Sequence, residues 1–157
     1  MARALSTDPK NDIFSKIFHE IIAGRAFCGG GFLAAGGGGI VSHAQLRNPT
    51  GSGKNLYIWK HSTVGGVYIT DYTTAMSSDI TSTSVFNLNR GSSITPVAQL
   101  RVENNATPLG TNLGDNRAFP AWNRSPALII VIPGQALSFR LDNANSPFFG
   151  QFLWWEE

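Results

Sequence analysis

The chain of 157 residues is poor in charge and in cysteine, and it has no long apolar run. Charged residues make up 14% of the chain, against about 25% in typical soluble domains. The net charge of +2 is too small, and the basic residues too scattered, to predict a nucleic-acid-binding surface. A single cysteine, Cys28, excludes an intramolecular disulfide and a zinc site built on cysteines. Because nothing approaches about eighteen consecutive apolar residues, we expect no membrane-spanning helix and no membrane partner.

Patterns typical of catalysis and metal binding are also missing. The three histidines do not have metal-ligand spacing within one element, and no Gly-x-Ser-x-Gly nucleophile elbow occurs. Asp71, Glu103 and Asp142 lie near the ends of expected strands and keep a hydrolase as an alternative. Many β-domains carry as many acids, so we expect no enzymatic activity, no metal and no cofactor.

Near its N-terminus the chain has the pattern of one amphipathic helix. Asp8 suits the N-cap, Pro9 the first helical position, and Gly24 the position just past the end. The large apolar residues recur with a period of about 3.6 and form one stripe: Ile13, Phe14, Ile17, Phe18, Ile21 and Ile22. The polar residues of the opposite face are Asp12, Ser15, Lys16, His19 and Glu20. Such a stripe predicts docking on the chain's own β-domain, on another copy or on a partner protein.

The segment that follows the helix, "AFCGGGFLAAGGGG", holds seven glycines in residues 26–39. Glycine-rich chain is flexible unless something packs against it. We therefore predict a linker or an extended arm here. This gives an N-terminal region of helix and arm, residues 1–38, followed by a β-domain of residues 39–157.

The rest of the chain is rich in β-branched and aromatic residues, broken by turn signals such as Asn48-Pro49 and Pro133-Gly134. Eight short strands are expected, at residues 40–46, 55–64, 66–70, 82–89, 96–104, 127–133, 135–143 and 149–155. This arrangement predicts an antiparallel β-sandwich or barrel. "ALIIVIP", residues 127–133, is apolar on both faces and is expected to be a central strand. Trp154 and Trp155 should point to opposite faces, so that one enters the core and the other needs a cover.

"NPTGSGK", residues 48–54, has the look of a phosphate-binding loop but lacks its essential parts. The first glycine of that motif would fall at Asn48, and Asn55 stands where a hydroxyl residue should follow Lys54. We interpret the segment as a hairpin between two strands, with Gly51 and Gly53 supplying unusual backbone angles. Lys54 is then expected to be a solvated loop residue.

Three segments, "LRNPTGSGKNLYIWK", "VIPGQALSFRLDNANS" and the terminal "FLWWEE", resemble small structural proteins of tailed-bacteriophage virions. In that group an Asn-Pro-x-Gly-Ser-Gly-Lys hairpin opens a β-sandwich, a Pro-Gly turn leads into a late strand, and an aromatic-acidic strand closes the chain. The resemblance covers residues 40–157 and leaves out the helix and the glycine-rich segment. It implies a jelly-roll-like domain, commonly trimeric, that decorates or cements a capsid or belongs to the tail.

The sequence thus favours a non-enzymatic virion protein, a capsid decoration or cement protein that forms a homotrimer and binds the major capsid protein or other virion subunits. The expected interface residues are Ile13, Phe14, Ile17, Phe18, Ile21, Ile22, Trp154 and Trp155. The alternative is a tail-tip or fibre module that binds a host receptor or carbohydrate. It would use residues 104–125, where Trp122 and Arg124 could be displayed.

Overall fold

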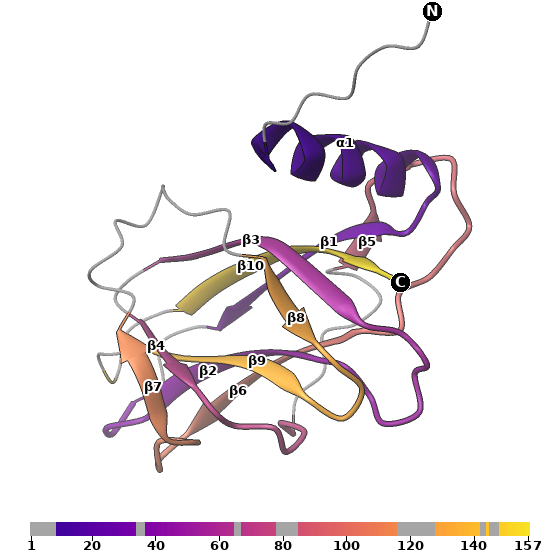
Figure 1. The fold of residues 1–157 in the computed structure, drawn as a ribbon. Coiled ribbons are helices and arrows are strands. Elements are labelled where there is room, and N and C mark those ends of the chain that lie inside the picture. The colour runs from indigo at the N-terminus through magenta and orange to yellow at the C-terminus, as the bar shows by residue number, and fades with distance from the viewer. Residues whose placement is uncertain are drawn as a thin grey trace, which may run out of the picture.

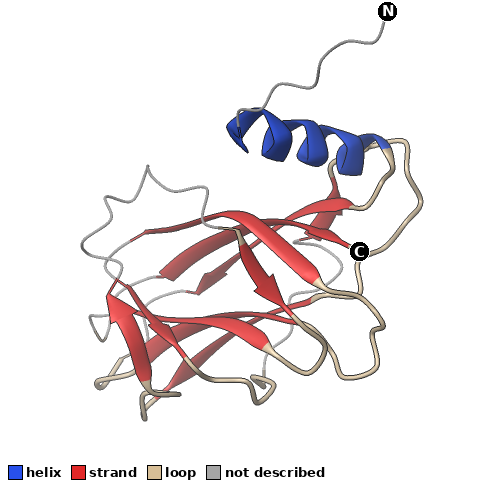
Figure 2. Ribbon diagram, viewed as in Figure 1, coloured by secondary structure: helices blue, strands red, loops and turns tan. Residues whose placement is uncertain are grey.

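Two antiparallel sheets and one helix form the secondary structure of the protein, which is mainly β (Figure 1). Figure 2 shows the two layers of strands, with the helix lying outside them. The computed structural model describes residues 9–33, 37–64, 67–77, 85–115, 128–141, 144 and 148–157.

The helix α1 spans Pro9–Ile22, with Pro9 in its first turn as the sequence predicts. Ala23 N donates to His19 O at 2.9 Å, and Gly24 follows with a φ of +72°. A left-handed glycine just past the last turn is a common way to end a helix. The predicted helix, its start at Pro9 and its end before Gly24 are confirmed, and the predicted N-cap residue Asp8 lies outside the described residues.

Sheet A has the strand order β5-β1-β10-β3-β8. Its strands are β1 (Ala26–Leu33), β3 (Leu56–Val64), β5 (Val85–Asn87), β8 (Ile129–Val131) and β10 (Phe148–Glu156). The long strand β10 lies between β1 and β3, and all pairings are antiparallel.

Sheet B has the strand order β6-β2-β9-β4-β7. Its strands are β2 (Val41–Arg47), β4 (Val67–Thr70), β6 (Gln99–Asn105), β7 (Asn112–Asp115) and β9 (Ala136–Leu141). All eight predicted strands are present, and the sequence pattern missed β1 and β7.

The core lies between the two sheets and draws side chains from both. Its fully buried residues include Phe27, Ile58 and Trp154 of sheet A, and Leu46 and Leu100 of sheet B. Contact across the gap is direct, since the rings of Phe139 in β9 and Phe152 in β10 lie 5.4 Å apart. In long strands such as β2, β6 and β10, alternate residues point into this core, as the period of two in a strand requires.

The strand pairs are nested along the chain. β4 pairs with β7, β3 with β8, β2 with β9 and β1 with β10, so each outer pair encloses the next inner one. These pairs alternate between the sheets, with the first and third in sheet B and the others in sheet A. β5 and β6 lie in the connection between β4 and β7 and extend one edge of each sheet.

The expectation of a flexible glycine-rich arm is wrong for residues 26–33, which form β1 inside sheet A. β1 pairs with β10 along its whole length and with β5. Its glycines permit close packing, because a Cβ on Gly29 would lie 2.9 Å from Val85 Cγ2 and 3.2 Å from the ring of Trp154. The glycine-rich composition predicted a flexible segment. In the structure, a glycine is needed at a position such as Gly29 because a larger side chain would clash with its neighbours. The β-structure therefore begins well before residue 39.

The expected hairpin at residues 48–54 is also wrong, because β2 belongs to sheet B and β3 to sheet A. The segment crosses from one sheet to the other. Gly51 and Gly53 do take positive φ values, of +80° and +68°, as predicted. The buried side chain of Asn48 donates to Lys54 O at 2.7 Å and to Val131 O at 2.8 Å, which ties the crossing to β8.

"ALIIVIP" does not form a central strand: β8 lies at an edge of sheet A. Val131 is buried in the core, but Ile130 and Ile132 are each 54% exposed. Apolarity on both faces usually indicates a covered strand, and within the described residues this one is covered on one face only.

Candidate functional site

The most unusual surface of the protein is the outer face of sheet A, the face that points away from the core. Trp154 is buried in the core, and Trp155 points to the outer face, so the predicted opposite orientations are confirmed. Trp155 stacks on Tyr57 with ring centroids 5.0 Å apart and an interplanar angle of 5°, and lies 5.6 Å from the ring of Trp59. It is only 3% exposed, because α1 lies over this end of the sheet (Figure 1).

Ion pairs attach α1 to the sheet beneath it. Lys16 Nζ lies 3.0 Å from Glu157 Oε2, at the end of the chain after β10. Glu20 is fully buried and accepts hydrogen bonds from Arg25, with Nε at 2.6 Å and Nη2 at 3.0 Å. Lys16 Nζ also lies 3.0 Å from Glu20 Oε1. The helix thus docks in cis with part of its polar face turned inward.

Opposing effects act on the pKa of Glu20. Burial alone would raise it, but the hydrogen bonds from Arg25, Lys16 and His19 outweigh burial and lower the pKa to about 2 from its ordinary 4.5. The carboxylate is therefore charged at neutral pH, when it holds α1 to Arg25 at the start of β1.

Because Glu20 faces the sheet, the apolar stripe of α1 is turned only partly inward. Ile13, Ile17 and Ile21 are half-buried, whereas Phe14, Phe18 and Ile22 are 70%, 65% and 61% exposed. The exposed three recur every fourth residue and so form one line along the helix. We call this line the ridge.

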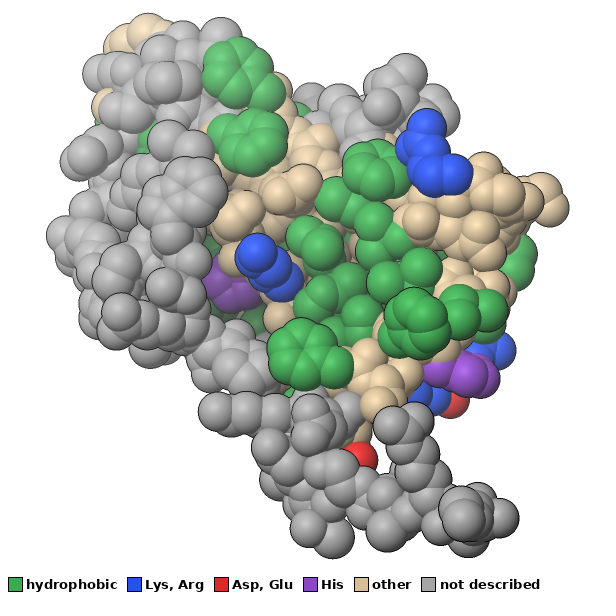
Figure 3. Space-filling model, turned by 90° about the horizontal axis from the view of Figure 1, so that it is seen from above, with side chains coloured by type: hydrophobic (Ala, Val, Ile, Leu, Met, Phe, Trp, Pro, Cys, Tyr) green, Lys and Arg blue, Asp and Glu red, His purple; other side chains and the backbone are tan. Residues whose placement is uncertain are grey.

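Beside the ridge, the outer face of sheet A carries more exposed apolar side chains. Phe86 is paired with Cys28, and Phe32 with Phe149, so all four share the outer face. Phe32, Phe86 and Phe149 are exposed, and Leu153, which pairs with Cys28 on the same face, is half-buried. We call Phe32, Phe86, Phe149 and Leu153 the floor. Figure 3 shows hydrophobic side chains gathered over this face.

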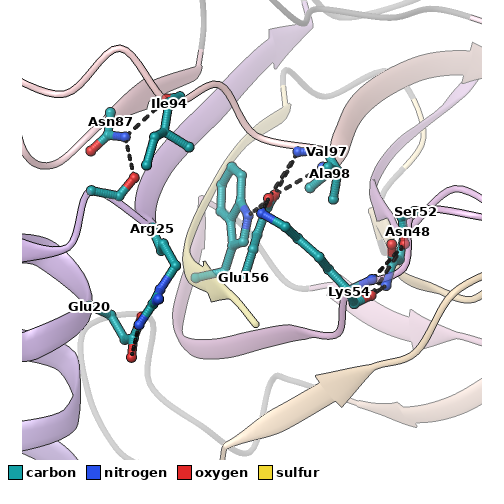
Figure 4. A network of polar contacts seen from close by, with 12 residues as sticks. Glu20, Arg25, Asn48, Ser52, Lys54, Asn87, Ile94, Val97, Ala98 and Glu156 are labelled. Carbon is teal, nitrogen blue, oxygen red and sulfur yellow. Dashed lines mark hydrogen bonds and ion pairs between the residues drawn. The ribbon is translucent and has the colours of Figure 1, made fainter.

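A second buried carboxylate, Glu156, faces the core side of sheet A. It accepts hydrogen bonds from Val97 N at 2.9 Å, Ala98 N at 3.0 Å and Trp154 Nε1 at 3.2 Å (Figure 4). Lys54 Nζ lies 3.8 Å from Glu156 Oε2, so Lys54 is an ion-pair partner and not the solvated loop residue expected. These contacts hold the end of β10 against the segment before β6, so the role of Glu156 is structural.

Several described polar groups with catalytic potential are likewise engaged in structural contacts. Asp71 accepts from Thr111 N, and Glu103 accepts from Ser77 N at 2.8 Å; Asp142 lies outside the described residues. His43 is buried and accepts from Leu109 N at 3.1 Å, and burial lowers its pKa. Across the described ranges, no three His, Cys, Asp or Glu residues group as metal ligands would. Nor does any described helix have the length and hydropathy to cross a bilayer.

The residues proposed for the interface divide into three groups, of which the half-buried Ile13, Ile17 and Ile21 are one. Phe14, Phe18 and Ile22 are at the surface, whereas both tryptophans are buried within the chain. The sequence reading missed the exposed Phe32, Phe86 and Phe149. The phenylalanines of "FCGGGFL" and "FFGQFLWW" were the available signal for Phe32 and Phe149. The alternative ligand residues Trp122 and Arg124 lie outside the described residues.

Comparison of the chain with models of protein families, with curated proteins and with solved structures found no match.

Proposed function

We propose that this chain is a non-enzymatic structural protein of a bacteriophage virion, a capsid decoration or cement protein that acts as a homotrimer. The observation that carries the proposal is the partly uncovered apolar face formed by the ridge and the floor. Contiguous apolar surface of this kind marks association sites on soluble proteins. The major capsid protein or another virion subunit is the partner, and the virion is the location.

The strand order supports a jelly roll as the fold of this domain. Without β5 and β6, the sheets read β1-β10-β3-β8 and β2-β9-β4-β7, with the nested pairs divided between them. A long hairpin folded over into two facing sheets has this order. Viral capsid proteins are one of the groups that use jelly rolls, although lectins and cupins use them too, so the fold alone does not assign the function.

The use of polar groups favours assembly over catalysis. Glu20 and Glu156 are both fully buried, yet each is saturated by contacts that hold one segment to another. A catalytic carboxylate needs access to substrate. Both carboxylates have fully buried side chains, so neither offers that access.

The test uses virions produced with the chain present, deleted, or altered by Ile17→Asp together with Phe18→Asp. Quantitative mass spectrometry gives the number of copies per particle, and release of nucleic acid on heating gives particle stability. We expect particles that lack the chain to open at lower temperature and the double variant to lose occupancy. Full occupancy by the variant would exclude α1 as the anchor, and absence of the wild-type chain from particles would overturn the proposal.

A further inference from the structure

The ridge and the floor adjoin one another but are different in shape. The ridge is the exposed line of Phe14, Phe18 and Ile22 on a helix, which stands above the sheet. The floor is a sheet face in which Phe86 and Leu153 flank Cys28 of β1, and Phe32 of β1 and Phe149 of β10 pair with one another four residues farther along. One surface therefore presents both a projecting element and a flat one.

We propose that the ridge of one copy of this chain packs on the floor of another copy. This deepens the proposed function, on whose claim of self-assembly it rests, by naming the surface through which copies associate. A contact between two different patches of identical chains is head-to-tail, and such contacts form a ring where the rotation between copies closes and an open filament where it does not. A homotrimer is one such ring.

The exposed area matches what one contact of this kind requires. At about 200 Å² for a whole phenylalanine side chain, the exposed parts of the ridge and floor residues amount to roughly 600 Å². Apolar atoms make up about 57% of a typical interface, so a contact containing this area would bury about 1,100 Å² in total. That value exceeds the roughly 1,000 Å² expected of a biological interface.

A basic side chain lies at the border of the floor. Arg90 is exposed there, with its guanidinium 5.5 Å from the centroid of the Phe86 ring. Two floors laid together would bring like charges to one contact, whereas the ridge residues Phe14, Phe18 and Ile22 carry no charge. Like charges disfavour floor-on-floor packing relative to ridge-on-floor packing.

The first experiment measures the molar mass of the purified full-length chain by light scattering over a range of concentrations. The variants are Phe18→Asp in the ridge, Phe86→Asp in the floor, and Ile132→Asp as a control. Ile132 is exposed like Phe18 but follows β8, at the opposite edge of sheet A from β5. Circular dichroism and the urea midpoint establish for each variant that the fold is retained. Phe18→Gln replaces Phe18→Asp if the charged variant unfolds.

We expect the wild type and the control to have a multiple of the 16.9 kDa chain mass, and both patch variants to have the mass of one chain. A monomeric wild type at all concentrations, or folded patch variants that still associate, would overturn the proposal. A monomeric wild type that particles still retain would overturn this self-association but leave the virion assignment intact. A wild-type chain that self-associates in solution but is absent from particles would overturn the virion assignment and leave the self-association intact.

Mixing the two patch variants tests the ridge-on-floor geometry directly. Phe18→Asp keeps an intact floor and Phe86→Asp an intact ridge, so an equimolar mixture can form one complete contact and no ring. We expect the mixture to show a species of two chains that neither variant forms alone. A mixture that stays monomeric at the concentrations where the wild type is fully associated would overturn ridge-on-floor packing.

Discussion

The outer faces of the two sheets are covered in different ways. On sheet A the cover is α1, held by the ion pairs of Lys16 and Glu20, and part of the face stays apolar and open. On sheet B the cover is the loop of residues 71–77, which is held by neutral and charge-assisted hydrogen bonds. Both faces belong to the same fold, so the difference lies in the side chains that each presents.

On sheet B a row of polar side chains crosses β6, β2 and β9, formed by Arg101, Gln45 and Ser138. Gln45 Nε2 donates to Tyr72 O at 2.9 Å and to Thr74 O at 3.0 Å, and its Oε1 accepts from Met76 N at 3.3 Å. Ser138 Oγ and Arg101 Nη1 each donate to a loop carbonyl at 2.6 Å. The backbone polar groups of this loop thus find partners on the sheet.

Within the described residues, the loop over sheet B is fixed by hydrogen bonds to the sheet, whereas part of the outer face of sheet A stays apolar and exposed. Where the polar groups of the cover are already paired with the sheet, little remains there to bind another molecule. An exposed apolar face, by contrast, can be buried by any surface of complementary shape. Its burial is favourable whether that surface belongs to this chain or to another molecule. We therefore expect changes on sheet B to act on folding, and changes at the ridge and floor to act on association.

The largest effect on folding should follow Trp155→Ala, at the covered end of sheet A. The side chain is nearly fully buried and stacked on Tyr57, so its removal leaves a cavity under α1. We expect the free energy of unfolding in urea to fall by about 3–5 kcal/mol. Trp59→Ala, a half-buried neighbour on the same face, is the control and should cost less than half of that. A loss below about 1 kcal/mol for Trp155→Ala would contradict a covered Trp155.

Gln45→Ala should destabilise the fold through sheet B. It removes one donor to the carbonyls of Tyr72 and Thr74 and leaves the N–H of buried Met76 without its acceptor, and we expect a loss of roughly 2–3 kcal/mol in urea unfolding. The molar mass should not change, because the ridge and the floor are untouched. Gln99→Ala, a half-buried glutamine on β6, is the matched control and should stay within about 0.5 kcal/mol. Loss of association in Gln45→Ala would break the distinction between the two faces.

Acid should weaken the cover of sheet A through Glu20. Its pKa is about 2 in the folded chain and 4.5 ordinarily, so its contribution is complete above pH 4.5 and is lost as the pH falls towards 2. Because Arg25 and Lys16 are more than a third exposed, solvent screening limits this contribution to roughly 1–2 kcal/mol.

The measurement for Glu20 is the free energy of unfolding between pH 6 and pH 2.5 in the wild type and in Glu20→Gln. The variant should be less stable near neutral pH, and its stability should fall less steeply in acid. Gln45→Ala should keep the wild-type slope, since the amide does not titrate. Parallel curves for the wild type and Glu20→Gln would argue against a charged Glu20 as the attachment of α1.

The smallest effect on folding should come from Phe14→Gln in the ridge. The side chain is 70% exposed, and glutamine is a good helix former, so we expect a change within about 0.5 kcal/mol. The measurement is urea unfolding at a concentration low enough for the chain to be monomeric. A loss above about 1 kcal/mol would mean that the ridge is already buried within one chain, which would remove the contrast between the two faces.

Much of the local structure could be predicted because it depends on neighbours in the sequence. Pro9, the apolar period and Gly24 delimit α1, since a helix contacts itself within four residues. Alternating apolar residues located eight strands, because the period of two is a property of the strand itself. The positive φ values of Gly51 and Gly53 were foreseeable for the same local reason.

Other features depended on partners far along the chain. The glycines of β1 predicted a flexible arm, because the sequence does not show that Trp154 and Val85 pack over Gly29. "ALIIVIP" predicted a central strand. Its position at the edge of sheet A depends instead on which strands pair with β3, and the sequence does not show this. The crossing at residues 48–54 read as a hairpin, because a turn sequence does not state which sheet the next strand joins.

The sequence by itself determined that the chain is mainly β with one amphipathic helix, because backbone preference and apolar period act over a few residues. Only the tertiary structure decided how the helix is rotated about its axis. Buried Glu20 turns towards Arg25, and this rotation exposes Phe14, Phe18 and Ile22. The period of an apolar stripe defines a face, but the direction of that face depends on the contacts that dock the helix.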